Sequence, residues 1–222
     1  MTKRHKWVRN YWAKSVSGWR AKKEWKLVYF SDETKYNLVG SDGRHWCRRR
    51  VGEEFLDRYV VKQVKGGGGK VNVWGVISWW GVGRLHRVEG NLTAKQFVQI
   101  MEESLLGTFE NDFVSPEEVV FQQDNDPKHT AKISKQWFRN HNIRLLPWPA
   151  SSPDMNPIEH VWHILGCRVR RRSTLPRNAD EMWEALQAEW YKLDTQLIRG
   201  LIESMPRRVA ALKRAKGSYT KY

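Results

Sequence analysis

Apolar residues along the chain follow two spacings, one typical of strands and one typical of helices. The stretch "WKLVYFSDETKYNLVG" has two short β-favouring runs around residues 31–34, which predicts a strand, a turn and a second strand, with Asp32 at a strand end. Short apolar runs in "VNVWGVISWW", "EVVFQQ" and "IRLLPW" predict further strands. We expect these segments to form one mixed sheet.

Apolar residues three or four positions apart predict the helices. One helix begins at Thr93, forms a capping box with Gln96, and has an apolar face of Phe97, Ile100, Met101 and Leu105. Further helices are expected at 131–140 (with Ile133, Trp137 and Phe138), from 157 onward, around 182–191 and around 197–212. Residues 1–24, basic and rich in tryptophan, predict a helix and a connector. This order of elements indicates an α/β domain over 25–222, with a mixed sheet flanked by helices.

The segment at about 40–70 interrupts this pattern. It is polar, basic and glycine-rich, and it is too long for a simple turn, so we expect an insertion with a function of its own. The four glycines at its end, Gly66 to Gly69, are either part of this functional insertion or only a flexible linker.

The charge of the chain favours a polyanionic partner. The 222 residues include 39 Lys and Arg against 24 Asp and Glu, a net charge of +15, and many of the basic residues are clustered. Nucleic acid is the leading interpretation, and a role of the charge in solubility alone is the alternative. Two cysteines without a CxxC motif argue against a zinc finger or a disulfide framework. No apolar run approaches the roughly 18 residues of a membrane span, so we expect a soluble protein without a membrane partner.

Three carboxylates are candidates for chemistry. In "FQQDNDPKHT", Asp126 precedes Pro127 at a predicted helix start and is suited to cap that helix, whereas Asp124 follows a buried strand and has no capping role. Glu159 and Asp32 each have a structural alternative, as the partner of Asn156 in a capping box and as a turn aspartate. Together, carboxylates from separate elements match a site for two Mg²⁺ ions acting on a phosphodiester.

The motifs "FSDET", "VFQQDNDPKHT" and "WPASSPDMNPIEHVW" resemble those of the DDE transposases of the mariner superfamily, in its Sleeping Beauty-like branch. The 34 residues between Asp124 and Glu159 are typical of that branch. The resemblance spans nearly the whole chain, and it implies a ribonuclease H-like fold. It also implies that Asp32 contacts two Mg²⁺ ions, with Mn²⁺ as a substitute, while Asp124 and Glu159 each complete one site. The implied reaction is cut-and-paste transposition: hydrolysis of a DNA strand to leave a 3′-hydroxyl, which then attacks TA target DNA.

The same resemblance implies roles for other residues. The insertion at 40–70 would be a clamp loop reaching a partner subunit in a homodimer on double-stranded DNA, ending in a glycine strip of Gly66, Gly67, Gly68 and Gly69. Ligands or DNA would be oriented by Asn125, Asp126 and His129, with a helix-surface role as the alternative for His129. We expect a nuclear protein. Family members have helix-turn-helix units before this domain, so we also expect the chain to be a catalytic fragment or a truncated copy.

Basic clusters flank the candidate site. We expect phosphate contacts from two groups of arginines: Arg44, Arg48, Arg49 and Arg50, and Arg168, Arg170, Arg171 and Arg172. A late amphipathic helix should instead present a solvated basic face of Arg207, Arg208, Lys213, Arg214 and Lys216. Two alternatives to an active transposase stay open: a domesticated or decayed relative that only binds DNA or a partner, and a nuclease acting on RNA–DNA hybrids.

Overall fold

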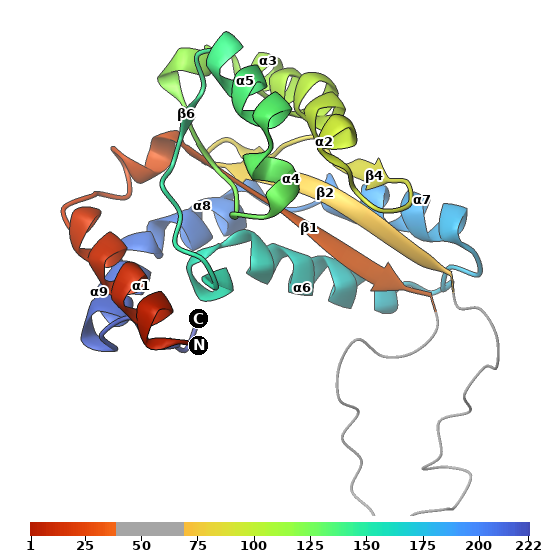
Figure 1. The fold of residues 1–222 in the computed structure, drawn as a ribbon. Helices are drawn as coiled ribbons and strands as arrows, with labels where there is room; N and C mark the ends of the chain where they lie inside the picture. The colour runs from red at the N-terminus through yellow and green to blue at the C-terminus, as the bar shows by residue number, and fades with distance from the viewer. Residues whose placement is uncertain (39–68) are drawn as a thin grey trace, which may run out of the picture.

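A mixed sheet forms the middle layer of the domain (Figure 1). The computed structural model describes residues 1–38 and 69–222, and most of the predicted clamp loop lies outside these residues. Among them, six strands form one sheet in the order β3-β2-β1-β5-β6, with β4 beside β2. The strands are β1 (Val28–Asn37), β2 (Lys70–Ser78), β3 (Gly81–Val82), β4 (His86–Val88), β5 (Val120–Gln122) and β6 (Arg144–Leu145). β1 is antiparallel to β2 and parallel to β5, which confirms the mixed sheet.

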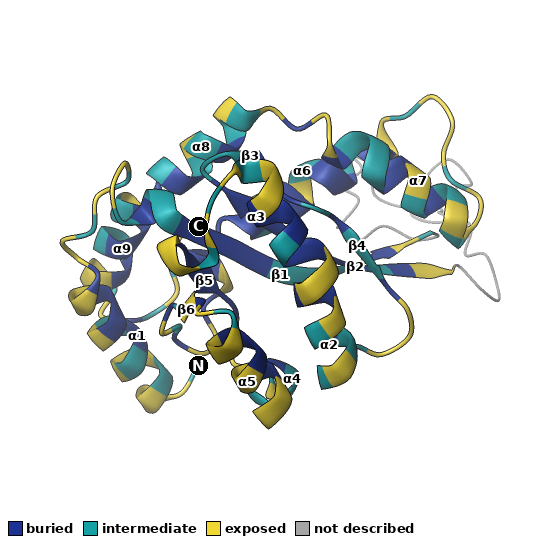
Figure 2. Cartoon of the chain, turned by 90° about the horizontal axis from the view of Figure 1, so that it is seen from above, coloured by how far each residue is buried: buried dark blue, intermediate teal, exposed yellow. Residues whose placement is uncertain are grey.

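Helices cover both faces of the sheet, and the strands between them are mostly buried (Figure 2). One face carries α1 (Lys3–Ser15), α6 (Ile158–Arg170), α7 (Ala179–Trp190), α8 (Thr195–Glu203) and α9 (Met205–Arg214). The other carries α2 (Ala94–Ile100), α3 (Leu106–Asp112), α4 (Pro127–Thr130) and α5 (Lys132–Asn140), with a π-helical turn, Met101–Leu105, joining α2 to α3. Short 3₁₀ helices lie at Trp25–Leu27, Pro116–Glu118 and Pro153–Met155. In the described part of the chain, no helix combines the length and the apolar character needed to cross a membrane.

The first predicted hairpin is wrong, because β1 is one continuous strand that runs through residues 31–34. β2 pairs with it from Phe30 to Asn37, so the backbone of the polar "SDET" stretch is hydrogen-bonded as part of a central strand. Successive side chains of a strand point to opposite faces, so Asp32 and Glu33 leave the sheet in opposite directions. Asp32 therefore lies in mid-strand and not at a strand end.

Most helix predictions are confirmed, and one differs in detail. The capping box of Thr93 and Gln96 is present, and Asp126 caps α4 through the amide of Lys128 (3.1 Å). The expected helix at 197–212 is two helices that separate at Ser204. Pro206 lies in the first turn of α9, where its missing N–H costs nothing, whereas it would break the interior of a longer helix.

α6 approaches the sheet closely at one glycine. Gly75 of β2 pairs with Asp32, and a Cβ at Gly75 would lie 2.6 Å from the Trp162 ring of α6. Trp162 in turn stacks on Trp190 of α7, with ring centroids 5.1 Å apart. The absence of a side chain at Gly75 thus lets the helix that begins next to Glu159 pack against the strand pair that holds Asp32.

Candidate active site

Strand register brings the first two carboxylates to the same level of the sheet. The parallel pairing of β1 and β5 ends at Phe30 and Gln122, and Asp32 and Asp124 each follow two residues later. β1 continues past this point beside β2, whereas the chain after β5 turns away into α4. Asp124 therefore lies just beyond the tip of β5, next to the central part of β1.

The third carboxylate arrives on the first turn of α6. The Asn156 side chain donates to the Ser31 carbonyl (3.1 Å) and accepts from the Ile158 amide (3.3 Å), so it ties the start of α6 to β1 beside Asp32. The N-cap of α6 is Pro157, so the expected N-cap role of Asn156 is wrong, and its side chain instead holds the residues just before the helix. Glu159, however, lines the same pocket as Asp32 and its carboxylate raises the pKa of Asp32, which favours the functional interpretation of Glu159 over the capping-box alternative.

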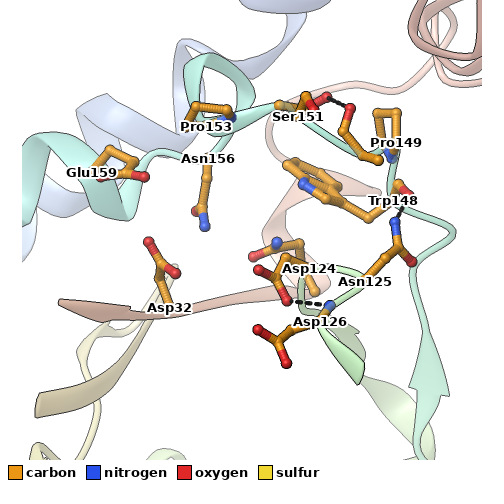
Figure 3. A pocket seen from close by; sticks show the side chains of 13 residues that line it. Asp32, Asp124, Asn125, Asp126, Trp148, Pro149, Ser151, Pro153, Asn156 and Glu159 are labelled. Carbon is orange, nitrogen blue, oxygen red and sulfur yellow. Dashed lines mark hydrogen bonds between the residues drawn. The ribbon is translucent and has the colours of Figure 1, made fainter. Parts of the chain in front are cut away.

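Asp32, Asp124 and Glu159 line one pocket of about 290 Å³. Figure 3 shows the Asp32 side chain leaving β1 toward Glu159 and Asn156, with Asp124 and Asp126 on the opposite side of the opening. The remaining wall comes mainly from the loop of residues 148–153. The structure therefore gathers three acidic side chains that are remote in the sequence.

Burial and, after it, neighbouring negative charge act on the carboxylates of the pocket. Burial, followed by the neighbouring carboxylates of Glu159 and Glu33, raises the pKa of Asp32 to about 8. Burial also raises the pKa of Glu159. Because both pKa values are raised, the pair retains a proton more readily than isolated carboxylates do. A bound cation would relieve this repulsion.

His129 is buried and orients Asp124 from the other side. Its Nδ1 lies 2.6 Å from Asp124 Oδ1, and its Nε2 lies 3.0 Å from Glu33 Oε1. Although burial opposes a charge on the ring, these hydrogen bonds raise the pKa of His129 to about 9, so the ring is an imidazolium that donates from both nitrogens. Burial acts against ionisation of Asp124 as well, but the hydrogen bond from His129 lowers its pKa overall. His129 is thus not a helix-surface residue.

Glu33 is a site neighbour that the sequence interpretation missed. It also forms a salt bridge with Lys128 (3.8 Å), on the face of β1 opposite Asp32. In a continuous strand, side chains alternate between the two faces, which would have predicted Glu33 on the face opposite Asp32. The turn predicted at residues 31–34 prevented this prediction.

The two other predicted orienting residues mainly support the chain locally. Asp126 caps α4 and forms a salt bridge with Lys128 (2.9 Å), while its own amide donates to Asp124 Oδ1 (2.9 Å). Asn125 donates to the Trp148 carbonyl (2.8 Å). Both residues line the pocket, and direct contact with DNA stays a prediction for them.

Only part of the predicted DNA-contact surface lies within the described residues. Arg44, Arg48, Arg49 and Arg50 fall outside them, as do Gly66, Gly67 and Gly68 of the glycine strip, whereas the Gly69 carbonyl accepts from the Leu38 amide (2.9 Å). In the second cluster, Arg168 donates to the Lys192 carbonyl, Arg172 pairs with Glu189 (2.7 Å), and Arg170 and Arg171 are exposed. On α9, Arg208 is 1% exposed, so the expected solvated face is wrong at that position.

The donor set of the pocket suits hard divalent cations. All three carboxylates offer oxygen ligands, which Mg²⁺ and Mn²⁺ prefer. In the described ranges 1–38 and 69–222, no three His, Cys, Asp or Glu side chains are arranged around a single ion position. Asp32 is the carboxylate that both others influence, because the charges of Glu159 and Asp124 each raise its pKa.

Comparison with known proteins agrees with this geometry. Residues 27–182 match the family described as DDE superfamily endonuclease. The chain is 39% identical to the Tc1 transposase of Caenorhabditis elegans over its whole length, covering 80% of that protein, and 39% identical to the Tcb1 transposase of Caenorhabditis briggsae, covering 76%.

The fold is that of the ribonuclease H-like catalytic domain of the Mos1 mariner transposase. The catalytic domain of Mos1 superposes with a TM-score of 0.76 at 17% identity, and the two chains cover each other almost completely (100% and 98%). In the Mos1 paired end complex with Mn, the TM-score is 0.83 at 18% identity, and the chain spans 65% of the longer Mos1 chain. The chain belongs to the DDE endonuclease superfamily and, within it, is the catalytic domain of a Tc1/mariner-type cut-and-paste transposase.

Proposed function

We propose that the domain cleaves DNA strands with two divalent metal ions and joins the resulting 3′-hydroxyl to TA target DNA. One observation carries the proposal: carboxylates from β1, from the tip of β5 and from the first turn of α6 line the same pocket. The retained triad and its buried support at His129 favour an active enzyme over a decayed relative.

Asp32, Asp124 and Glu159 are the residues that would hold Mg²⁺ or Mn²⁺, with Asp32 shared. Bound there, two ions would supply Lewis-acid activation of the attacking oxygen and charge stabilisation of the departing one. His129 and the Asp126 amide both donate to Oδ1 of Asp124, and no described residue hydrogen-bonds to its Oδ2. Asp124 is therefore fixed in orientation and keeps one oxygen for a ligand.

Double-stranded DNA is the proposed substrate, as transposon end and as target. Structural neighbours of the chain include the Mos1 paired end complex and the Mos1 strand transfer complex, which supports this substrate class. The net charge of +15 would strengthen phosphate contact, with Arg170 and Arg171 as exposed candidates at the C-terminal end of α6. A homodimer in the DNA complex and location in the nucleus complete the proposal.

Strand cleavage and joining test the proposal. We expect Mn²⁺ or Mg²⁺ to support nicking of supercoiled plasmid and joining of a pre-cut duplex with a free 3′-hydroxyl. Asp124→Ala should lower both rates at least about a hundredfold, because it removes a metal ligand. Its affinity for duplex DNA in Ca²⁺ should stay within about twofold, because phosphate contacts provide most of that affinity.

Glu184→Gln, an exposed carboxylate of α7, is the matched control and should retain full activity. Unchanged cleavage after Asp124→Ala would defeat the assignment. Salt-dependent DNA binding without any metal-dependent product would favour the binding-only relative. Cleavage confined to an RNA–DNA hybrid would favour the nuclease alternative.

A further inference from the structure

Arg9 of α1 is fully buried (0% exposed), so its charged guanidinium lies inside the domain. Its guanidinium forms a bidentate pair with Asp154, Nη1 to Oδ1 at 2.8 Å and Nη2 to Oδ2 at 2.6 Å. Nη1 also donates to the Ser151 carbonyl (2.8 Å) and the Ser152 hydroxyl (2.7 Å), and Nε donates to the Gly217 carbonyl (3.0 Å). The acceptors thus lie in two places, the loop before α6 and the C-terminal residues.

Asp154 is the centre of a larger network. The Thr220 hydroxyl (2.9 Å) and amide (3.2 Å) donate to its Oδ2, and Arg208 of α9 donates to its carbonyl (2.9 Å). Nη2 of Arg208 lies 3.2 Å from Nδ1 of His160, the residue after Glu159. Both ends of the described chain therefore meet at this loop, where α1 and α9 lie side by side (Figure 1).

The loop held in this way is a wall of the candidate active site. Ser151, Ser152 and Pro153 line the pocket together with Asn156 and Glu159. Ser151 has a left-handed backbone (φ 57°), which is unfavourable outside glycine and persists only when surrounding contacts fix it. Arg9 supplies such a contact by binding the Ser151 carbonyl.

A merely structural tie would not need this chemistry. Removing two charges from water costs several kcal/mol per ion, and an apolar pair of similar volume is often as stable or more stable. The bidentate geometry of arginine instead fixes distance and direction together. All the loop contacts of Arg9 fall within residues 151–154, just before Asn156 and the start of α6, so their joint effect is to define the path of the chain into α6.

We propose that Arg9 is a positioning residue for the active site, which holds Asp154 and its loop so that Glu159 faces Asp32. Arg208 and Thr220 support the same loop from the C-terminal side. The metal-binding part of this inference rests on the proposed function, whereas the hold on the loop does not.

The test is the double variant Arg9→Met with Asp154→Leu, which removes both buried charges together. Thermal unfolding should stay close to that of the unchanged protein. Amide hydrogen exchange of residues 149–157 should become roughly tenfold faster, while exchange in β1 stays the same. Mn²⁺ affinity, measured by calorimetry, should fall about tenfold or more, as is usual when a group that orients a metal ligand is lost.

Arg87→Met is the control, because it removes the ion pair of β4 with Asp180 (2.6 Å), away from the pocket. It should change neither loop exchange nor Mn²⁺ affinity. If the double variant does not fold, Thr220→Val removes one donor to Asp154 and leaves the ion pair intact, and it should change both readouts about two- to threefold in the same direction.

Loop exchange and Mn²⁺ affinity that stay unchanged in the folded variant would overturn the positioning role. Failure of the proposed function would look different: the unchanged protein would not bind Mn²⁺, yet loop exchange would still separate the variant from it.

Discussion

At the scale of single residues, the pocket depends on a carboxylate placed where it is electrostatically unfavourable. Asp32 lies in the middle of a central strand, beside Glu159, and its pKa is raised to about 8. The sequence was sufficient to select Asp124, because an aspartate directly after an apolar run has no local structural use. It could not reveal the partnership of His129 with Glu33, because that contact joins residues 96 positions apart across one face of the sheet.

Replacing Asp32 should abolish metal-dependent activity and raise the stability of the fold. The pKa of Asp32 in the folded protein lies above its ordinary value of 3.8. The protonated carboxyl therefore contributes fully to the stability of the fold below pH 3.8, and this contribution is lost as the pH rises through about 8. The side chain of Asp32→Asn cannot ionise. In EDTA at pH 9 we therefore expect the unfolding free energy of this variant to exceed that of the unchanged protein by about 1 kcal/mol or more, and its unfolding temperature to be higher.

Mg²⁺ or Mn²⁺ should raise the unfolding temperature of the unchanged protein and leave that of Asp32→Asn nearly constant. Differential scanning calorimetry at pH 5 and pH 9 measures both effects, with Glu184→Gln as the charge-matched control. An equal cation effect on the two proteins would contradict a metal site at Asp32.

At the scale of elements, the helices were easier to predict than the points where strands begin and end. The apolar positions of α6, namely Ile158, Val161, Trp162, Leu165 and Val169, are all buried as their spacing predicted. The turn predicted at 31–34 failed because local polarity was given more weight than pairing with β2, which is 35 or more residues away in the chain. A buried strand that carries functional side chains is locally similar to a turn, and only its neighbours resolve the ambiguity.

The packing of α6 on β2 gives a prediction about glycine. Gly75→Ala should destabilise the domain by about 1–3 kcal/mol, because the new methyl group would meet the rigid Trp162 ring. Gly200→Ala should stabilise it by about 0.5–1 kcal/mol, because Gly200 is an exposed position within α8 with nothing within 4 Å of the added Cβ. Urea unfolding of the two variants measures both signs. A stability loss at Gly75 no larger than the change at Gly200 would contradict the close approach of α6.

At the scale of the whole molecule, net charge overstates the surface available to DNA. Some of the 39 basic residues act inside the domain, and Arg9 and Arg208 are almost completely buried. Composition alone predicted a polyanionic partner, but it could not separate arginines that pack from arginines that face solvent. The late helix, expected to be a basic solvated face, shows this limit at Arg208.

The remaining surface charge should still govern binding to duplex DNA of arbitrary sequence. We expect the logarithm of affinity to fall linearly with the logarithm of salt concentration, and Arg171→Ala to reduce the slope by about 1 if that side chain contacts one phosphate. Fluorescence anisotropy across a salt series measures the slope. Arg87→Ala, which removes an arginine paired with Asp180, is the control. A slope unchanged by Arg171→Ala would remove that residue from the proposed interface.

The ladder between β1 and β2 closes with a bond from the Leu38 amide to the Gly69 carbonyl (2.9 Å), so these two residues, 31 positions apart in the sequence, lie side by side. Chain ends this close could equally be joined by a two-residue hairpin. The sheet and its pocket therefore place little restriction on the length or composition of what is inserted there. An exchange of that segment should therefore leave the pairing of β1 with β2 and the position of Asp32 as they are.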